Sequence, residues 1–150
     1  LVIRTFIEND IHIDKFIGDG ILAYAHPSGN SEEENTRALR ACNVLLESIP
    51  ALNEKYRQKG LPEIRIGGGI TRGEVVRGMI GSTDRLEYTI IGDSVNRAAR
   101  LEALTKDHSV SLIITDDVYR NSKETALKGF RNLGKSQLKG MSQEFEVYGR

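Results

Sequence analysis

The sequence has no tryptophan and only one cysteine, two methionines and three prolines among its 150 residues. A single cysteine excludes an internal disulfide framework. No apolar run approaches the roughly 20 residues that a membrane-spanning helix needs, and the opening residues do not have the pattern of a signal peptide. We therefore expect a cytoplasmic chain without a membrane segment, or the cytosolic domain of a larger, membrane-attached parent.

The sequence also lacks an excess of charge of either sign, because 21 Lys and Arg residues balance 21 Asp and Glu residues. Nucleic-acid-binding domains usually carry a basic excess, so we expect no nucleic acid partner. With 39% hydrophobic and 28% charged residues, the composition is that of a globular protein. We assign residues 1–150 to a single domain. Because the chain opens on Leu1, in what reads as the middle of an element, we expect a longer parent protein.

Hydrophobic periodicity predicts an alternation of strands and helices. Residues 11–25 are predicted to form a hairpin, because Ile11, Ile13, Lys15 and Ile17 share one strand parity before a glycine-flanked turn. Ser31 and the three glutamates after it predict the cap of a long helix, which Gly60 ends. The other predicted elements are two strands within 64–81 that turn at 72–74, a strand over 85–91, a helix from Asp93 or Ser94 to about Lys106, a strand over 112–114, a short helix from about 116, and strands near 130–138 and 144–148. This order predicts an α+β fold with mostly antiparallel pairing.

Two glycine-containing stretches have the residue spacing of phosphate-binding loops but lack the flanking strands and helices that such loops need. Residues 129–136 have the spacing of a Walker A motif, but a P-loop needs a strand before it and a helix after it, and the predicted order is the reverse. Residues 18–23 resemble a dinucleotide-binding fingerprint, but Pro27 follows too soon for the helix that this motif requires. We therefore interpret neither stretch as a phosphate loop, and the second as a hairpin turn.

Two other segments combine residue types that suit a polar ligand. In the first, Asp19 lies on a glycine-flanked turn and Lys15 takes a strand position otherwise occupied by isoleucine. These residues are either a cation ligand and a polar contact in a cleft, or a solvated surface turn. In the second, Asn96 and Arg100 are four residues apart on the predicted helix and therefore share a face. That face is either part of a site or an ordinary exposed surface.

The motifs in and around these segments are Lys15-Phe16-Ile17-Gly18-Asp19, the glycines at 69, 73, 78 and 81, Glu87-Tyr88-Thr89-Ile90-Ile91-Gly92, Val95-Asn96-Arg97-Ala98-Ala99-Arg100 and Leu138-Lys139-Gly140. In this order and spacing they make the chain, from about Ile11 to Tyr148, resemble the class III nucleotidyl cyclases, the adenylyl and guanylyl cyclase catalytic domain. The resemblance implies a ferredoxin-like βαββαβ core with additional C-terminal strands.

The resemblance also implies roles for matching residues. Asp19 matches one of two aspartates that hold a pair of divalent cations, Mg or Mn. Lys15 matches the lysine that hydrogen-bonds the purine edge in adenylyl cyclases. Thr89 matches its partner, which is Asp in many adenylyl cyclases and Thr in one bacterial-type subgroup, whereas guanylyl cyclases typically carry Glu and Cys at the two positions. ATP is therefore the expected substrate. Because a threonine hydroxyl both donates and accepts, base discrimination should be looser than with Asp.

The remaining matches concern the ribose and the phosphates. Asn96 matches the asparagine that orients the ribose, and Arg100 the arginine that stabilises charge at the α-phosphate. Lys139 and Arg85 match triphosphate contacts, Arg85 beside a loop of variable length. The implied reaction is in-line attack of the ribose 3′-hydroxyl on the α-phosphate, which yields cyclic AMP and pyrophosphate. It depends mainly on positioning and on neutralising charge.

In this family the site lies between two protomers, so a homodimer with two equivalent sites is expected, and a monomer should be inactive. Asp19 of one copy would serve a nucleotide held by the base, ribose and phosphate residues of the other. Two alternatives stay open. One is a non-catalytic cyclase homology module that dimerises or senses nucleotide for a regulatory domain in the parent, and the other is a guanylate cyclase.

One part of the family pattern is absent. The first metal aspartate of the family lies on an initial strand far upstream of the position of Asp19, and here only 18 residues precede Asp19. The resemblance therefore implies that the first strand and its helices are missing and that residues 1–150 are a partial catalytic domain. We expect these residues alone to bind metal-nucleotide weakly and to make little or no cyclic AMP.

Overall fold

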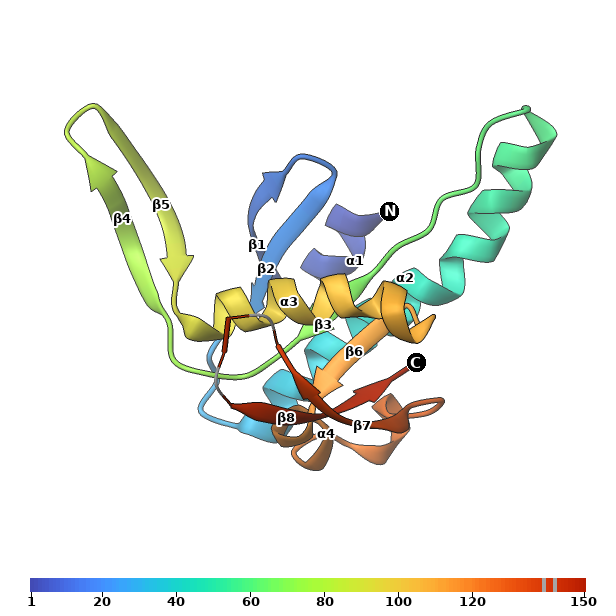
Figure 1. Cartoon of the computed structure of the whole chain (residues 1–150). Coiled ribbons are helices and arrows are strands. Elements are labelled where there is room, and N and C mark those ends of the chain that lie inside the picture. The colour runs from blue at the N-terminus through green and yellow to red at the C-terminus, as the bar shows by residue number, and fades with distance from the viewer. Residues whose placement is uncertain (139, 142) are drawn as a thin grey trace.

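The structure is a computed structural model that describes residues 1–138, 140, 141 and 143–150, with the backbone but not the side chain of Arg85. Its helices and its groups of strands are interspersed along the chain (Figure 1). They are α1 (Val2–Glu8), β1 (Ile11–Ile17), β2 (Gly20–Ala25), α2 (Ser31–Gln58), β3 (Gly68–Ile70), β4 (Val76–Ser82), β5 (Arg85–Ile91), α3 (Asp93–His108), β6 (Leu112–Thr115), α4 (Asp116–Arg120), the 3-10 helix η1 (Glu124–Ala126), β7 (Arg131–Gln137) and β8 (Glu144–Gly149). Within the described residues, no helix combines the length and the apolar character needed to cross a membrane.

The core is built around a four-stranded sheet in the order β3-β6-β8-β7. β3 and β6 are parallel, and the other two pairs are antiparallel. All four residues of β6 are buried, because helices cover both faces of the sheet at this strand. On one face Leu112 and Ile114 pack with Leu39 of α2. On the other face Ile113 packs with Leu101 of α3. The sheet therefore has a hydrophobic core on each side.

α3 lies directly against β3 because a glycine separates them. A Cβ added to Gly69 would lie 2.2 Å from the carbonyl oxygen of Ala98 and 2.7 Å from the amide nitrogen of Glu102, both in the α3 backbone. A residue with a side chain would push the helix away from the strand, so only glycine permits this approach. The position of α3 relative to the sheet is therefore set at β3.

Two hairpins are separate from the central sheet. Among the described residues, β1 pairs with β2 and β4 pairs with β5, each as a two-stranded sheet. Figure 1 shows β4 and β5 extending away from the rest of the molecule, and we name residues 76–91 the β4–β5 arm. Contacts between β5 and β1 connect the arm to the first hairpin.

The α+β class with mostly antiparallel strands is confirmed, as is the hairpin over residues 11–25. Both rejections of a phosphate loop are also confirmed. Residues 18 and 19 form the turn between β1 and β2, and residues 131–137 form strand β7 where a P-loop would begin its helix.

The predicted hairpin with its turn at residues 72–74 is wrong. Both of its strands exist, but β3 pairs in parallel with β6, and β4 pairs with β5. The alternation of apolar residues predicts a strand, but the partner depends on what packs against it, and here α3 covers β3.

Two predicted helix caps are also wrong. The cap of α2 is Asn30 rather than Ser31, and its side chain accepts a hydrogen bond from the first turn of the helix. The cap of α3 is Gly92 rather than Asp93 or Ser94. In both cases a residue predicted as the cap is the first residue of the helix, and the observed cap lies one residue earlier, which is within the usual uncertainty of helix ends.

Candidate functional site

A β-bulge in β1 places Asp14 and Lys15 on the same side of the strand. The register of β1 against β2 shifts between Ile13 and Lys15, so Asp14 is an extra residue that pairs with no residue of β2. In a regular strand the side chains of these neighbours would point to opposite faces. Here Asp14 contacts Thr89 and Lys15 contacts Glu87, both on β5. The sequence predicts that Lys15 shares one strand face with Ile11 and Ile13, but the bulge interrupts this alternation before Lys15.

The carboxylate of Asp14 is buried where β1 meets β5, and its side chain is 3% exposed. Its Oδ2 atom accepts a hydrogen bond from the hydroxyl of Thr89 at 2.7 Å. Its Oδ1 atom accepts from the amide N–H of Ile90 at 3.2 Å. Thr89 is itself buried. Asp14 therefore fastens the first hairpin to the β4–β5 arm with both carboxylate oxygens.

Lys15 and Thr89, which the sequence predicts as a pair that contacts one base, lie together around Asp14. The ammonium nitrogen of Lys15 is 3.7 Å from Asp14 Oδ2 and 2.8 Å from Glu87 Oε1. Glu87 and Thr89 are two residues apart on β5, so they share one face of the arm. The side chain of Lys15 is 23% exposed, which keeps its ammonium within reach of a ligand from solvent.

Asn96 and Arg100 share a face of α3, and both line a hollow of about 360 Å³. The other residues around the hollow come from α3 and from the segment between β7 and β8, and are Asp93, Arg97, Gly140, Met141 and Gln143. Asn96 is exposed and Arg100 is half-buried, so neither lies in the interior. Arg100 forms no hydrogen bond or ion pair with any residue that the structure describes. Its guanidinium is therefore available to a ligand in the hollow.

Arg97 lines the same hollow but is held by the protein. Its guanidinium carbon lies 4.6 Å from the centre of the Phe145 ring, a cation–π distance. Its Nη1 atom donates long hydrogen bonds of 3.4 Å to the hydroxyl of Thr71 and 3.5 Å to the carbonyl of Arg72. These contacts join α3 to β8 and to the segment before β4. The two arginines of the hollow thus differ, since Arg97 is engaged in packing.

Asp19 lies on the exposed turn between β1 and β2, next to Gly18, whose φ is +61°. A carboxylate supplies the hard oxygen ligands that Mg and Mn prefer, so Asp19 fits the role of one metal ligand. Among the described residues, however, no three His, Cys, Asp or Glu side chains are grouped so that they could hold a metal ion. A complete metal site therefore needs ligands in addition to those that this part of the chain brings together.

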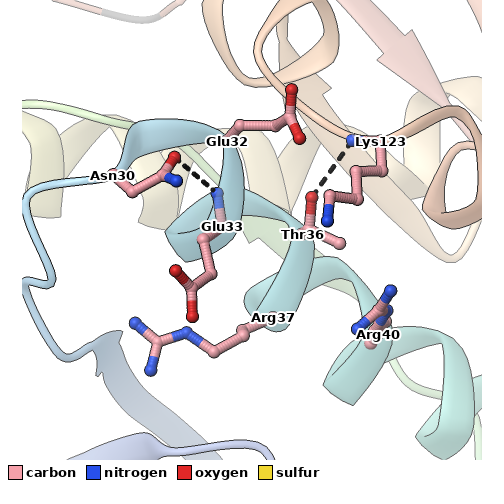
Figure 2. A pocket seen from close by; sticks show the side chains of 7 residues that line it. All are labelled: Asn30, Glu32, Glu33, Thr36, Arg37, Arg40 and Lys123. Atoms are coloured by element: carbon pink, nitrogen blue, oxygen red, sulfur yellow. Dashed lines mark hydrogen bonds between the residues drawn. The ribbon is translucent and has the colours of Figure 1, made fainter.

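A second hollow, of about 310 Å³, lies at the start of α2 (Figure 2). It is lined by Asn30, Glu32, Glu33, Thr36, Arg37, Arg40 and Lys123. The Asn30 side chain accepts from the amide of Glu33, and the Thr36 hydroxyl accepts from the amide of Lys123. The hollow contains none of the predicted site residues. Its acidic and basic side chains are mixed, so it has no field of one sign that would favour a charged ligand.

Two predicted contacts lie outside the part of the chain that the structure describes. Lys139 is not among the described residues, and of Arg85 only the backbone is described. The sequence did not predict a role for Asp14, because simple alternation points it away from the face of Lys15. It also did not single out Arg97, although this residue lies between the two predicted helix residues.

The chain matches the family described as Adenylate and Guanylate cyclase catalytic domain over residues 5–149. An adenylate cyclase from Anabaena cylindrica is 37% identical over 141 residues, which is 91% of this chain and 27% of that protein. Adenylate cyclase 1 from Rhizobium meliloti is 34% identical over 140 residues, which is 93% of this chain and 21% of that protein. The chain thus spans about a quarter of the length of these relatives.

Solved structures of nucleotidyl cyclases have a fold similar to that of this chain. The crystal structure of the adenylyl cyclase CyaB from P. aeruginosa has a TM-score of 0.81 at 25% identity and covers 99% of this chain and 75% of that chain. The crystal structure of the guanylyl cyclase Cya2 has a TM-score of 0.80 at 25% identity and covers 99% of this chain and 73% of that chain. Overall structural similarity therefore does not distinguish an adenylyl cyclase from a guanylyl cyclase. The choice between adenine and guanine depends on the residues around Lys15.

Proposed function

The chain belongs to the adenylate and guanylate cyclase catalytic-domain family, and from this premise we propose that it is the catalytic domain of an adenylate cyclase, which converts ATP to cyclic AMP and pyrophosphate. The observation that carries the choice of ATP is that Lys15 and Thr89 lie together, linked by Asp14. An ammonium donates hydrogen bonds, and a hydroxyl oxygen can accept them. A ring nitrogen and an exocyclic amine, the two groups on this edge of adenine, match that pair.

On this proposal the residues of α3 act on the ribose and the α-phosphate. Asn96 orients the ribose, and Arg100 stabilises the charge that develops as the 3′-hydroxyl attacks in line and pyrophosphate leaves. The shared hollow, and the lack of any hydrogen bond or ion pair from Arg100 to the described residues, support these roles. Arginine suits the task because its fork of donors is rigid and its charge is permanent. Lys139 and Arg85 would add contacts to the triphosphate.

We also propose that Asp19 is one ligand of a pair of divalent cations, Mg or Mn. Its exposed carboxylate on an open turn supports this role. Such cations, when bound, lower the pKa of a coordinated hydroxyl and neutralise phosphate oxygens. The other ligands would come from outside the residues that the structure describes.

The active form would be a homodimer, with the β4–β5 arm in its interface. Met79, Leu86 and Tyr88 share the face of the arm opposite to Thr89, because strand positions of opposite parity point to opposite faces. These three side chains are 53–59% exposed. An exposed apolar patch of this kind is typical of an interaction surface. A second copy would cover it and would supply Asp19 to the hollow beside α3.

We further propose that residues 1–150 form one domain of a longer cytoplasmic or membrane-attached parent that also contains a regulatory domain. The support is that the chain spans only 27% and 21% of the two curated adenylate cyclases described above.

The test is a cyclase assay on the parent protein with ATP or GTP in the presence of Mg or Mn. We expect a preference for ATP. Lys15→Glu combined with Thr89→Cys should move the preference toward GTP, because a carboxylate accepts where the ammonium donated. Lys55→Glu, a matched charge reversal at an exposed position of α2, should leave the preference unchanged. A preference for GTP in the unsubstituted protein would contradict the base assignment.

A non-catalytic cyclase homology module is the second candidate, favoured by the incomplete set of metal ligands among the described residues. The same assay separates the two candidates. If the parent protein carries an upstream aspartate and still forms no product from either nucleotide with Mn, the module is the better interpretation.

A further inference from the structure

We infer that Asp14 sets the hydrogen-bond polarity of Thr89 and thereby determines which group at position 6 of a purine the site accepts. The inference rests on the proposed function, since it concerns base recognition at that same site. It gives Asp14 a positioning role, exerted through Thr89 rather than by contact with the base. The bulge at Asp14 is what allows this role, because it turns the carboxylate toward β5 beside Lys15.

The neighbours of the Thr89 hydroxyl are both hydrogen-bond acceptors. Oγ1 lies 2.7 Å from Oδ2 of Asp14 and 3.4 Å from the carbonyl oxygen of Ile90. A carboxylate and a carbonyl have no proton to give, so the hydroxyl must donate its only proton to this side. At 2.7 Å the bond to Asp14 is the shorter and stronger one. The Thr89 oxygen is left with lone pairs alone to offer to a ligand.

Asp14 has no alternative arrangement at low cost. Its second oxygen accepts from the amide of Ile90, and its side chain is 3% exposed, so water cannot readily replace the Thr89 hydroxyl. Turning the hydroxyl away would leave Oδ2 without its hydrogen-bond donor, since the ammonium of Lys15 lies 3.7 Å away, beyond hydrogen-bond distance. Losing a hydrogen bond to a buried carboxylate oxygen is unfavourable. The polarity of Thr89 is therefore held by the protein before any ligand arrives.

This fixed polarity has a direct consequence for the base. Adenine carries an amine at position 6, which donates, whereas hypoxanthine and guanine carry a carbonyl, which accepts. An oxygen that offers only lone pairs accepts from the amine and repels the carbonyl. A free threonine hydroxyl would accommodate either group. The contact with Asp14 removes that ambiguity, so Thr89 discriminates more sharply than its residue type suggests.

The experiment replaces Asp14 with asparagine in the parent protein. The Asn carboxamide has the same shape, can accept from Ile90 with its oxygen, and can donate to Thr89 with its nitrogen, which frees the hydroxyl proton. The probes are 3′-deoxy-ATP and 3′-deoxy-ITP, which lack the attacking hydroxyl, so equilibrium competition binding with Mg measures affinity without turnover. We expect the unsubstituted protein to favour the adenine probe and Asp14→Asn to reduce that affinity ratio by about tenfold or more.

Variants of Thr89 show whether the effect passes through this residue. In a Thr89→Val background, Asp14→Asn should have no further effect on the ratio, because the hydroxyl is already gone. Thr89→Ser should retain the ratio of the unsubstituted protein, since it keeps the hydroxyl. Thr89→Val alone should lower the ratio to the part that Lys15 supplies, because the ring nitrogen beside the carbonyl of hypoxanthine carries a proton and cannot accept from the ammonium. These two single variants leave Asp14 intact and therefore test the inference even if Asp14→Asn does not fold.

The outcomes separate this inference from the proposed function. If the parent protein makes cyclic AMP but the ratio is the same with Asp14→Asn, or falls equally in the Thr89→Val background, the polarity role is wrong and the cyclase assignment stands. A ratio that Thr89→Val leaves unchanged has the same meaning. If the unsubstituted parent neither binds the two probes nor forms a cyclic nucleotide, both proposals are overturned together.

Discussion

Gly69 of β3 and Ala98 of α3 are in backbone contact, since a Cβ on the glycine would lie 2.2 Å from the carbonyl oxygen of the alanine. Real Cβ atoms do not approach an oxygen so closely. Even the smallest side chain at this position must therefore move the strand or the helix. Because α3 also carries Asn96 and Arg100, this contact connects the central sheet to the hollow that these two residues line.

Gly69→Ala is expected to displace α3 and to lower the free energy of unfolding by about 1–3 kcal/mol, the usual cost of overpacking. Denaturant unfolding measures this change. Gly78→Ala is the matched control, because nothing lies within 4 Å of a Cβ added to that strand residue. If the two variants lose the same stability, the contact with α3 is not what requires a glycine at position 69.

Arg100→Lys in the parent protein is expected to lower the kcat for cyclic AMP formation by about a hundredfold or more, as loss of a transition-state donor usually does. Lysine retains the charge but not the rigid fork of donors, so it should not substitute. The KM for ATP should change little. Arg65→Lys, at an exposed position outside the hollow, should leave kcat unchanged. A kcat for Arg100→Lys close to that of the unsubstituted protein would remove the role proposed for Arg100.

Two inactive variants are expected to restore activity when they are mixed, if the site is shared between protomers. In a heterodimer of Asp19→Ala and Asn96→Ala, one site carries both substitutions and the other carries neither. Random mixing of equal amounts should therefore recover about a quarter of the activity, because half of the dimers have one intact site. Mixing Asn96→Ala with Arg100→Ala should recover none, since both residues act from the same copy. Recovery in neither mixture would show that Asp19 and Asn96 do not meet across a dimer.

Glu34 of α2 should make stability depend on pH in the acid range. Its carboxylate accepts from the amide of Ser28 at 2.6 Å, from the amide of Gly29 at 3.1 Å and from Arg72 at 3.1 Å. The Ser28 hydrogen bond is the main cause that holds the pKa of Glu34 below its ordinary value of 4.5. A group with a lowered pKa stabilises the fold fully above its ordinary value and loses that effect as the pH falls through the lower native value.

The Tm of Glu34→Gln should accordingly lie below that of the unsubstituted chain near neutral pH, and the two should converge in acid. Thermal unfolding across that range measures the difference, and Glu32→Gln, at an exposed position in the same turn of α2, is the control. A gap between Glu34→Gln and the unsubstituted chain that does not change with pH would show that the charge of Glu34 is not its cause.

The elements that depend on local pattern could be predicted from the sequence. The hairpin of β1 and β2 follows from alternation around a glycine turn, and the shared face of Asn96 and Arg100 follows from the helical repeat. The pairing of β3 could not be predicted in this way. Its glycines resemble those of a turn-rich hairpin, but Gly69 is required because the backbone of α3 lies against it, and that requirement is a property of the tertiary structure.

Within the site, the limit of sequence reasoning is the bulge at Asp14. A one-residue shift of register reverses the facing of a side chain, and no local pattern marks where a bulge will form. The resemblance to the cyclases could therefore identify Lys15 and Thr89 but not the carboxylate between them. The proposed approach of Asp19 to α3 of a second copy is also beyond local pattern, since it would concern two copies of the chain.

The separation of the hairpins from the central sheet has a consequence for how a ligand is held. Lys15 and Thr89, proposed to contact the base, lie where Asp14 joins the first hairpin to the β4–β5 arm, whereas Asn96 and Arg100 lie on α3, which packs against the sheet at Gly69. A free base would touch only the first of these parts, whereas a nucleoside would also reach Asn96 through its ribose. A nucleoside triphosphate is long enough to contact both parts at once. Its binding would therefore fix the hairpins and α3 relative to each other, which a free base could not do.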